Sequence, residues 1–382
     1  MARWILAIAL VASSHAGPIC PVSACPGCNA TGATFCEEIA AMDIAAIVRL
    51  AKSPPVKAGD VELPKATFEI VQILKGERLV RKGERFDALF FGEAKVGTAF
   101  LVMGVGPPKI QWSTPLVLSD RGSEYLREIL KLPKDGPERL AFVQSYLEDA
   151  DEKLASDAYN EFARAPHTDV KALKDRMDHD RLVRWINDPE IPAIRRRLYL
   201  LMLGVCGDEG DLPMLEGFLR SKDRQAKAGL DMVISCYLTL KGESGLALVE
   251  ELFLANTQAD YADTYSAIMA IRLQADNFGG IGKPALIKAL HPMLQRPELA
   301  DLVIPDLARW EDWGAIDRLF VLYRDADPKN SWLRVPVINY LRACPLAKAK
   351  DLLRECERID PAAVKRANTF FPVPPSVGNT AG

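Results

Sequence analysis

Four cysteines crowd together near the N-terminus, and their spacing is the strongest sign of a chemical site. They are Cys20, Cys25, Cys28 and Cys36, in the pattern C-x4-C-x2-C-x7-C. In an exported protein a tight, even set of cysteines predicts a disulfide staple, and the sequence leaves all three pairings open. The C-x2-C pair could instead hold one zinc ion. Covalent haem needs a histidine directly after C-x2-C, and Asn29 stands there, so haem attachment is excluded.

The pair Cys25 and Cys28 raises a further option, the redox site of a thiol oxidoreductase. Such a site follows a strand and opens a helix, whereas this pair lies in a leader rich in proline and glycine. The other four cysteines lie within apolar helical patterns, and we expect buried free thiols at Cys206, Cys236, Cys344 and Cys356.

Histidine and glycine motifs give no sign of catalysis. Beyond the leader the chain has His167, His179 and His291, and none belongs to an H-x-x-x-H or H-E-x-x-H pattern. His167 lies in an expected loop, where we predict an exposed ring. No G-x-S-x-G, P-loop or G-x-G-x-x-G sequence occurs. We therefore predict no catalytic residue, no metal site and no cofactor, and a protein that is not an enzyme.

The segment 1–16 resembles a secretory signal peptide. Arg3 supplies a positive charge, Trp4 to Ala12 form a short apolar run, and residues 14–16 (Ser-His-Ala) fit a small-x-small cleavage site. We expect this segment to be removed. The mature chain would then begin at Gly17, in the periplasm or outside the cell.

A lipid anchor is the alternative at this end of the chain. Val22-Ser23-Ala24-Cys25 resembles the lipobox of bacterial lipoproteins, whose cysteine is acylated, which would place the protein at the cell envelope. A lipobox normally follows the apolar run directly, and here residues 17–21 intervene. No other stretch approaches the length of a transmembrane helix, so we expect no transmembrane segment in the mature chain.

Residues 37–118 show the alternation of apolar and polar positions that β-strands require. Glycine and proline separate five short segments, which predicts a small closed barrel after a cysteine-rich leader at 17–36. The expected strands are 43–50, 66–74, 85–91, 98–105 and 109–118.

Three stretches of this region resemble the netrin/TIMP-type OB-fold module. They are Ala41–Val48, Thr67–Gly76 and Val96–Val102, behind the cysteine-rich leader. The resemblance implies an OB-like barrel and, as one function, inhibition or regulation of a protease. Inhibitors of that family chelate the protease zinc with a cysteine at the mature N-terminus, whereas the N-terminus expected here is Gly17, ahead of Cys20.

The expected hairpin at 75–85 gathers five basic side chains and is a candidate binding surface. Glu77 and Glu84 interrupt the cluster, and the whole chain has a formal net charge of −3. The chain therefore lacks the basic field that collects nucleic acid, and we expect no nucleic-acid partner. The basic residues are Lys75, Arg78, Arg81, Lys82 and Arg85.

Beyond Asp120 the apolar period changes to that of helices, and a repeat emerges. After a linking helix and hinge at 119–137, an apolar pair recurs at intervals of about 30–38 residues over 138–360. Pro305 and Pro336 lie inside expected helices and predict bends. Bent helical hairpins of this length resemble HEAT repeats, with armadillo-like stacking as the near alternative. The resemblance implies an all-α solenoid of about five to six hairpins with an extended binding surface.

Two tryptophans and the C-terminal segment complete the pattern. Trp310 and Trp313 are near an expected helix end, where they would either grip a peptide or sugar or pack between hairpins. The segment 361–382, which ends in prolines and small polar residues, is expected to be a disordered tail.

Together these patterns predict an α+β multidomain protein, with a five-stranded OB-like barrel followed by a HEAT-like α-solenoid. We expect an exported, non-catalytic interaction or scaffold protein that binds a protein partner through the solenoid surface. A protease inhibitor acting through the leader and barrel is the first alternative, and a thiol oxidoreductase using Cys25 and Cys28 is the second. The sequence does not identify the partner.

Overall fold

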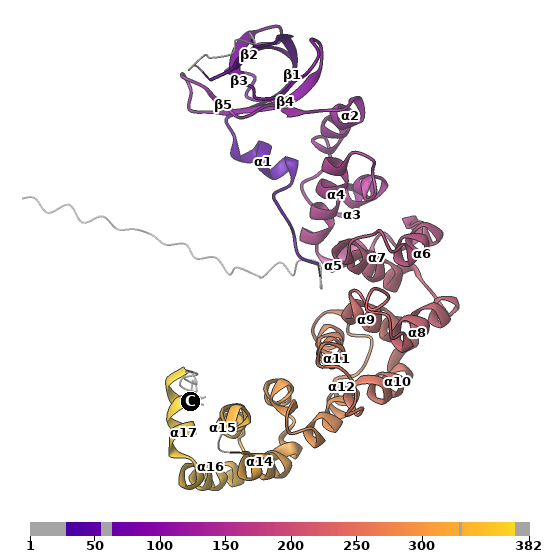
Figure 1. Cartoon of the computed structure of the whole chain (residues 1–382), viewed down its shortest axis with the longest axis vertical. Helices are drawn as coiled ribbons and strands as arrows, with labels where there is room; N and C mark the ends of the chain where they lie inside the picture. The colour runs from indigo at the N-terminus through magenta and orange to yellow at the C-terminus, as the bar shows by residue number, and fades with distance from the viewer. Residues whose placement is uncertain (1–27, 55–62, 328–330, 371–382) are drawn as a thin grey trace, which may run out of the picture.

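The computed structural model describes residues 28–54, 63–327 and 331–370 of the chain. It is an α+β structure, in which a barrel-like antiparallel sheet is followed by a helical region that curves away from it (Figure 1). The expected signal peptide at 1–16, Cys20, Cys25 and residues 371–382 lie outside the described residues.

Helix α1 (Phe35–Ala41) leads into a six-stranded sheet. The strand order is β3-β2-β1-β4-β5, and β6 also pairs with β4. Every pair is antiparallel, as is usual for strands that follow one another along the chain. The strands are β1 (Ile44–Lys52), β2 (Lys65–Lys75), β3 (Arg85–Leu89), β4 (Ala99–Val105), β5 (Gln111–Trp112) and β6 (Leu116–Val117).

The sheet curls until its two edge strands nearly meet. Phe86 of β3 stacks on Trp112 of β5, with ring centroids 4.0 Å apart. Inside the barrel, the buried Phe68 ring lies edge-on to Phe90 at 5.9 Å and to Phe100 at 5.4 Å. Buried aromatic pairs of this kind add about 0.5–1.5 kcal/mol each to the stabilisation from apolar burial, so these rings hold the five-strand barrel together.

The first four expected strands are confirmed to within two residues at each end. The expected fifth strand at 109–118 is wrong as one element, because it forms the short strands β5 and β6. Pro115 between them has no N–H to donate to a neighbouring strand. Ser113 instead turns toward β4, where its hydroxyl accepts a hydrogen bond from the Met103 N–H at 3.1 Å.

Sixteen helices, α2 to α17, follow the sheet in the described part of the chain. They are α2 (Asp120–Ile129), α3 (Pro137–Val143), α4 (Glu152–Arg164), α5 (His167–Lys171), α6 (His179–Asn187), α7 (Ala193–Cys206), α8 (Leu212–Arg220), α9 (Leu230–Lys241), α10 (Leu246–Val249), α11 (Tyr261–Leu273), α12 (Lys283–Leu290), α13 (Ile304–Arg309), α14 (Ile316–Asp325), α15 (Arg334–Ala343), α16 (Ala347–Ile359) and α17 (Pro361–Phe370).

The helical region forms a curved arc (Figure 1). Helices α7, α9, α11 and α15 lie on its inner side, and α6, α8, α10, α14 and α16 lie on its outer side. Their buried apolar side chains form one continuous core that also reaches α2 and α1. A single hairpin could not bury its own apolar face, so the arc depends on stacking.

Three ion pairs link parts of the helical region at a nearly constant sequence separation. Arg197 pairs with Asp231, 34 residues away. Lys227 likewise forms an ion pair with Asp263, 36 residues away. Farther along, Arg272 donates two hydrogen bonds to Asp306, again 34 residues away. These contacts join α7 to α9, the segment before α9 to α11, and α11 to α13.

Buried arginines make a second recurring contact, with the carbonyl groups at helix ends. Arg196 donates to the Ile186 carbonyl at 3.0 Å. Arg296 donates to the Phe253 carbonyl at 2.9 Å, and Arg334 to the Ala326 carbonyl at 3.0 Å. The last carbonyls of a helix have no partner within the helix and carry partial negative charge. Each guanidinium therefore satisfies a helix end that would otherwise be buried without a donor.

The prolines of the helical region do not bend helices, so that expectation is wrong. Pro305 lies in the first turn of α13 and Pro336 in the first turn of α15. At these positions the missing N–H has no intrahelical partner to lose, so proline starts a helix rather than kinking it.

The expected disordered tail is also wrong over residues 361–370, which form helix α17. The Asp360 carboxylate accepts a hydrogen bond from the Ala363 N–H at 2.9 Å and so caps the helix start. Ala363 and Ala367 are fully buried against the preceding helices. Small apolar residues one turn apart are enough for this docking, which the polar composition of the segment concealed.

One apolar stretch of the described residues, Leu230–Leu254, has the length and composition of a membrane-spanning helix, although 56% of it is buried inside the structure. Gly242 interrupts this stretch with a φ of 70°, which ends α9. The apolar side chains on both sides of Gly242 belong to the core of the arc.

Replacing Gly217 with alanine should stabilise the protein. Gly217 lies inside the outer helix α8, and a Cβ atom there would meet nothing within 4 Å. Glycine in a helix interior costs about 1 kcal/mol relative to alanine. We expect Gly217→Ala to raise the free energy of unfolding by about 0.5–1 kcal/mol in chemical denaturation. No change, or a loss, would contradict the helical assignment of this position.

Candidate functional site

The leader crosses from the barrel to helix α4 and is held there by hydrogen bonds. The Tyr159 hydroxyl donates to the Asn29 carbonyl at 3.1 Å, and the Thr31 N–H donates to Asn160 Oδ1 at 2.8 Å. Arg164 donates to the Gly32 carbonyl. All three side chains belong to the C-terminal half of α4, so this part of the helix holds the leader.

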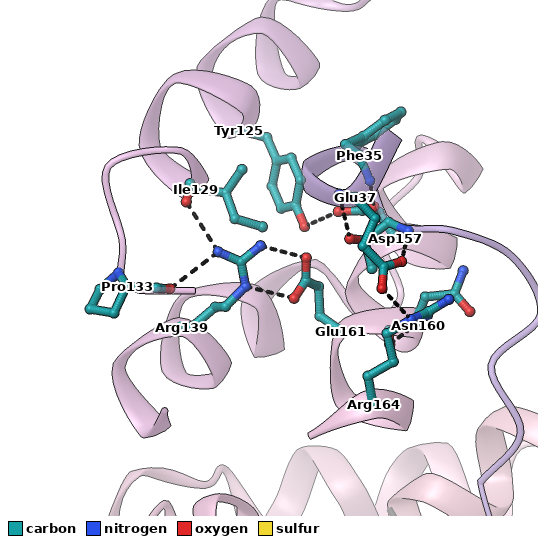
Figure 2. Close-up of polar contacts among 11 residues, drawn as sticks. Phe35, Glu37, Tyr125, Ile129, Pro133, Arg139, Asp157, Asn160, Glu161 and Arg164 are labelled. Carbon is teal, nitrogen blue, oxygen red and sulfur yellow. Dashed lines mark hydrogen bonds and ion pairs between the residues drawn. The ribbon is translucent and has the colours of Figure 1, made fainter. Parts of the chain in front are cut away.

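Asp157 lies at the centre of this junction (Figure 2). Its carboxylate accepts a hydrogen bond from the Phe35 N–H at 2.6 Å and one from the Tyr125 hydroxyl at 2.5 Å. It therefore joins α4 to both α1 and α2. Burial raises the pKa of Asp157 to about 7, although both hydrogen bonds act in the opposite direction. Glu161, one turn away, adds to the rise.

Arg139 and Glu161 form a buried, two-pronged ion pair beside Asp157. Arg139 Nε and Nη2 lie 2.6 Å from the two Glu161 oxygens. The remaining nitrogen, Nη1, donates to the carbonyls of Ile129 and Pro133 at the end of α2 (Figure 2). The pair thus fastens α3, α4 and α2 at one point. The guanidinium of Arg139 and the carboxylate of Glu161 therefore both make contacts between different helices.

Cys36 lies next to this pair, in a cavity of about 350 Å³ that Glu161 and Arg164 also line. Burial raises the pKa of the Cys36 thiol, although Arg139 nearby acts to lower it. A raised thiol pKa lowers the fraction of nucleophilic thiolate at a given pH.

The structure describes two of the four candidate cysteines. Cys36 carries a free thiol in this structure, and its side chain interacts with Arg139. Cys28 is disulfide-bonded, while Cys20 and Cys25 lie outside the described residues. The expected buried free thiols are confirmed at Cys236, Cys344 and Cys356, and Cys206 is free and half-buried.

The basic hairpin is partly used for internal contacts. Lys75 donates to the Ala40 carbonyl at 2.6 Å and so caps the end of α1. Arg85 pairs with Glu69 on the neighbouring strand at 2.7 Å. Arg78, Arg81 and Lys82 are exposed at the turn.

The two candidate tryptophans do not form an exposed surface. Trp310 is only 7% exposed and belongs to the core of the arc. Trp313 is half-buried, and its ring lies 5.3 Å from the ring of Tyr340 on α15. Both rings therefore pack between helices.

A different aromatic pair is exposed on the inner helix α11. The parallel rings of Tyr261 and Tyr265 stack with centroids 6.1 Å apart, and the residues are 58% and 40% exposed. Farther around and along the same helix, Thr264, Ile268 and Ile271 are fully buried. The i, i+4 spacing of the tyrosines is visible in the sequence, but nothing in the sequence shows that this stripe is left uncovered.

The expectation of an exposed His167 is wrong. Its ring lies 5.0 Å from the ring of Phe278, and Nδ1 is buried without a hydrogen-bond partner among the described residues. Burial lowers the pKa of His167 to about 4, with Lys171 adding to the effect, so the ring is neutral near pH 7. His167 forms part of a cavity of about 280 Å³ between the inner helices α7 and α9.

The other two histidines pair with carboxylates. His179 Nε2 lies 2.9 Å from Asp211, which raises the pKa of the histidine. His291 Nε2 lies 2.7 Å from Asp312. Within the described ranges, no group of three or more histidine, cysteine or acidic side chains is arranged to hold a metal ion. Both pairs join neighbouring elements of the arc.

These observations leave three features for functional assignment: the junction around Asp157, the exposed tyrosines of α11 and the cavity at His167. Comparison with protein-family models, with curated proteins and with solved structures finds no match to this chain. The assignment of function therefore depends on these features alone.

Proposed function

We propose that this protein is an exported, non-catalytic scaffold that binds a protein partner on the inner face of a HEAT-like α-solenoid. The single observation that carries the proposal is the exposed, stacked pair Tyr261 and Tyr265 on the inner helix α11. Tyrosines are enriched among residues that dominate binding energy, because one ring combines a large apolar area with a polar hydroxyl.

The repeated contacts along the arc support the solenoid interpretation. Lys227 and Asp263 are separated by nearly the same number of residues as Arg272 and Asp306. Curved stacks of helical hairpins expose long concave surfaces, and such surfaces are used for binding. The OB-like barrel is proposed as an N-terminal cap of the stack, fastened through α2 and α4.

The part of the partner that meets Tyr261 and Tyr265 should present apolar or aromatic side chains rather than a strong charge. The cations Arg197, Lys227 and Arg272 are each paired with a carboxylate of this chain. They are therefore neutralised before any partner arrives. The tyrosine pair offers ring faces and two hydroxyl groups, which suit an apolar segment with backbone groups to hydrogen-bond.

The export proposal is supported by the run Trp4 to Ala12 and the small residues after it. Protease inhibition through the leader and thiol exchange at Cys25 and Cys28 are kept as the alternative proposals, and Cys25 lies outside the described residues.

Site-specific photo-cross-linking in an exporting host tests the proposal. A photoreactive phenylalanine analogue in place of Tyr265 should form one dominant protein adduct. The same analogue in place of the exposed Phe91 of the barrel, or of Lys350 on the outer helix α16, should not form that adduct. Equal adducts from all three positions, or an adduct from position 91 alone, would contradict binding on the inner face.

A further inference from the structure

The cavity at His167 has the composition of a small-molecule site. Its wall is mostly apolar and comes from α7 and α9, with Phe278 closing one side. Its volume of about 280 Å³ lies near the lower end of the range of about 300–1,000 Å³ typical of ligand pockets. The apolar lining residues are Leu200, Leu201, Val205, Met232 and Phe278.

Glycine makes room for this cavity. Gly204 lies on α7 where the helix faces α9, and a Cβ atom there would be 3.8 Å from Thr239 and 3.9 Å from Cys236. These are ordinary contact distances, so alanine fits without strain. A methyl group at Gly204 would reduce the cavity that the glycine lines.

The rim of the cavity is cationic. Lys171 and Lys174 line it and are exposed. Neither ammonium group has an ion-pair or hydrogen-bond partner among the described residues, unlike the paired cations Arg197, Lys227 and Arg272. The half-buried His167 adds an unpartnered ring nitrogen to the wall. An apolar cavity with an unpaired cationic rim is complementary to a ligand with an apolar body and an anionic end.

We propose that this cavity binds a small amphiphilic carboxylate, with its alkyl chain between α7 and α9 and its carboxylate at Lys171 and Lys174. The inference does not depend on the proposed protein partner, since the cavity is complete within one chain. The neutral state of His167 near pH 7 suits this arrangement, because its ring contributes to the apolar wall without adding a buried charge.

Calorimetric titration of the full mature chain with butanoate, hexanoate and octanoate tests the inference. Each buried methylene contributes about 0.8 kcal/mol, so affinity should rise about fourfold for each added methylene group until the cavity is full. Octanol, which has the same chain without the carboxylate, should bind about tenfold more weakly than octanoate. Lack of saturable octanoate binding, or equal affinity for octanol, would overturn the proposal.

Two sets of variants test whether the ligand binds in this cavity. Lys171→Gln/Lys174→Gln should weaken octanoate about tenfold and leave octanol unchanged, whereas the same loss of charge at the exposed Lys288 and Lys350 should change neither. Gly204→Ala should shorten the best-fitting chain by about one methylene, and Gly217→Ala should not. Equal effects of the cavity and control variants would show that the ligand binds elsewhere.

Discussion

Replacing Arg139 with methionine should lower the free energy of unfolding by about 3–5 kcal/mol, the loss typical of a buried ion pair deprived of one partner. Glu161 would keep its charge in a buried position, since the side chains of the pair are only 7% and 9% exposed. The double variant Arg139→Met/Glu161→Leu should lose less than Arg139→Met alone, because no unpaired charge is left. Chemical denaturation of the three proteins measures the difference.

The matched control is Arg354→Met on helix α16. Arg354 pairs with Asp351, but both side chains are about 70% exposed. An exposed pair of this kind contributes at most about 1 kcal/mol. Equal losses for Arg139→Met and Arg354→Met, or a double variant no more stable than Arg139→Met, would contradict the described junction.

Replacing Asp157 with asparagine should remove a pH dependence of stability. The pKa of Asp157 is about 7 in the folded protein, whereas the ordinary value of an aspartate is 3.8. Between these two values the folded state holds a proton that the unfolded state has released, so stability falls as pH rises. From pH 5 to pH 8 the wild type should lose about 2–3 kcal/mol relative to Asp157→Asn. Unfolding free energies at several pH values measure this difference.

Asparagine suits the test because it has the shape of the carboxyl group and can hydrogen-bond to both Phe35 and Tyr125. The variant should be more stable than the wild type above pH 7, and the difference should shrink as the pH falls toward 4. Glu93→Gln, at an exposed position of the barrel, controls for loss of a carboxylate. Parallel pH profiles of wild type and Asp157→Asn would contradict a raised pKa at this site.

These two variants test how the barrel is joined to the arc. Asp157 and Glu161 lie on one face of α4, and between them they contact α1, α2 and α3. The ends of α2 and the leader are thereby fixed to the first helices of the arc. Because all the polar groups bond across elements, the junction acts as a structural clamp that sets where the barrel stands relative to the inner face.

Elements governed by local patterns were predictable from the sequence. Alternation of apolar and polar residues identified β1 to β4. The predictions of one strand at 109–118 and of bends at Pro305 and Pro336 were wrong for the same reason. Proline's effect depends on its position within an element, and the sequence does not fix element boundaries to one turn.

The candidate sites were not predictable, because distant segments form them. Phe35 and Asp157 are 122 residues apart, and Thr31 and Asn160 are 129 apart. The i, i+4 spacing of Asp157 and Glu161 could have drawn attention to α4, but the same spacing is common on exposed helices. His167 and Trp310 were also misjudged or left open, because their roles depend on whether they are buried. Whether a residue is buried depends on how neighbouring helices pack, which the local sequence does not show.

The affinity of the partner for the inner face tests the central claim most directly. The partner that cross-links at position 265 should first be purified. Its affinity should then be measured for the wild type, for Tyr261→Ala/Tyr265→Ala and for Phe91→Ala. The account predicts that the tyrosine variant binds at least about 30-fold more weakly, since residues that dominate an interface cost about 2 kcal/mol or more when truncated. Phe91→Ala should bind like the wild type. Unchanged binding by the tyrosine variant, or a loss confined to Phe91→Ala, would contradict the claim that the inner face is the binding surface.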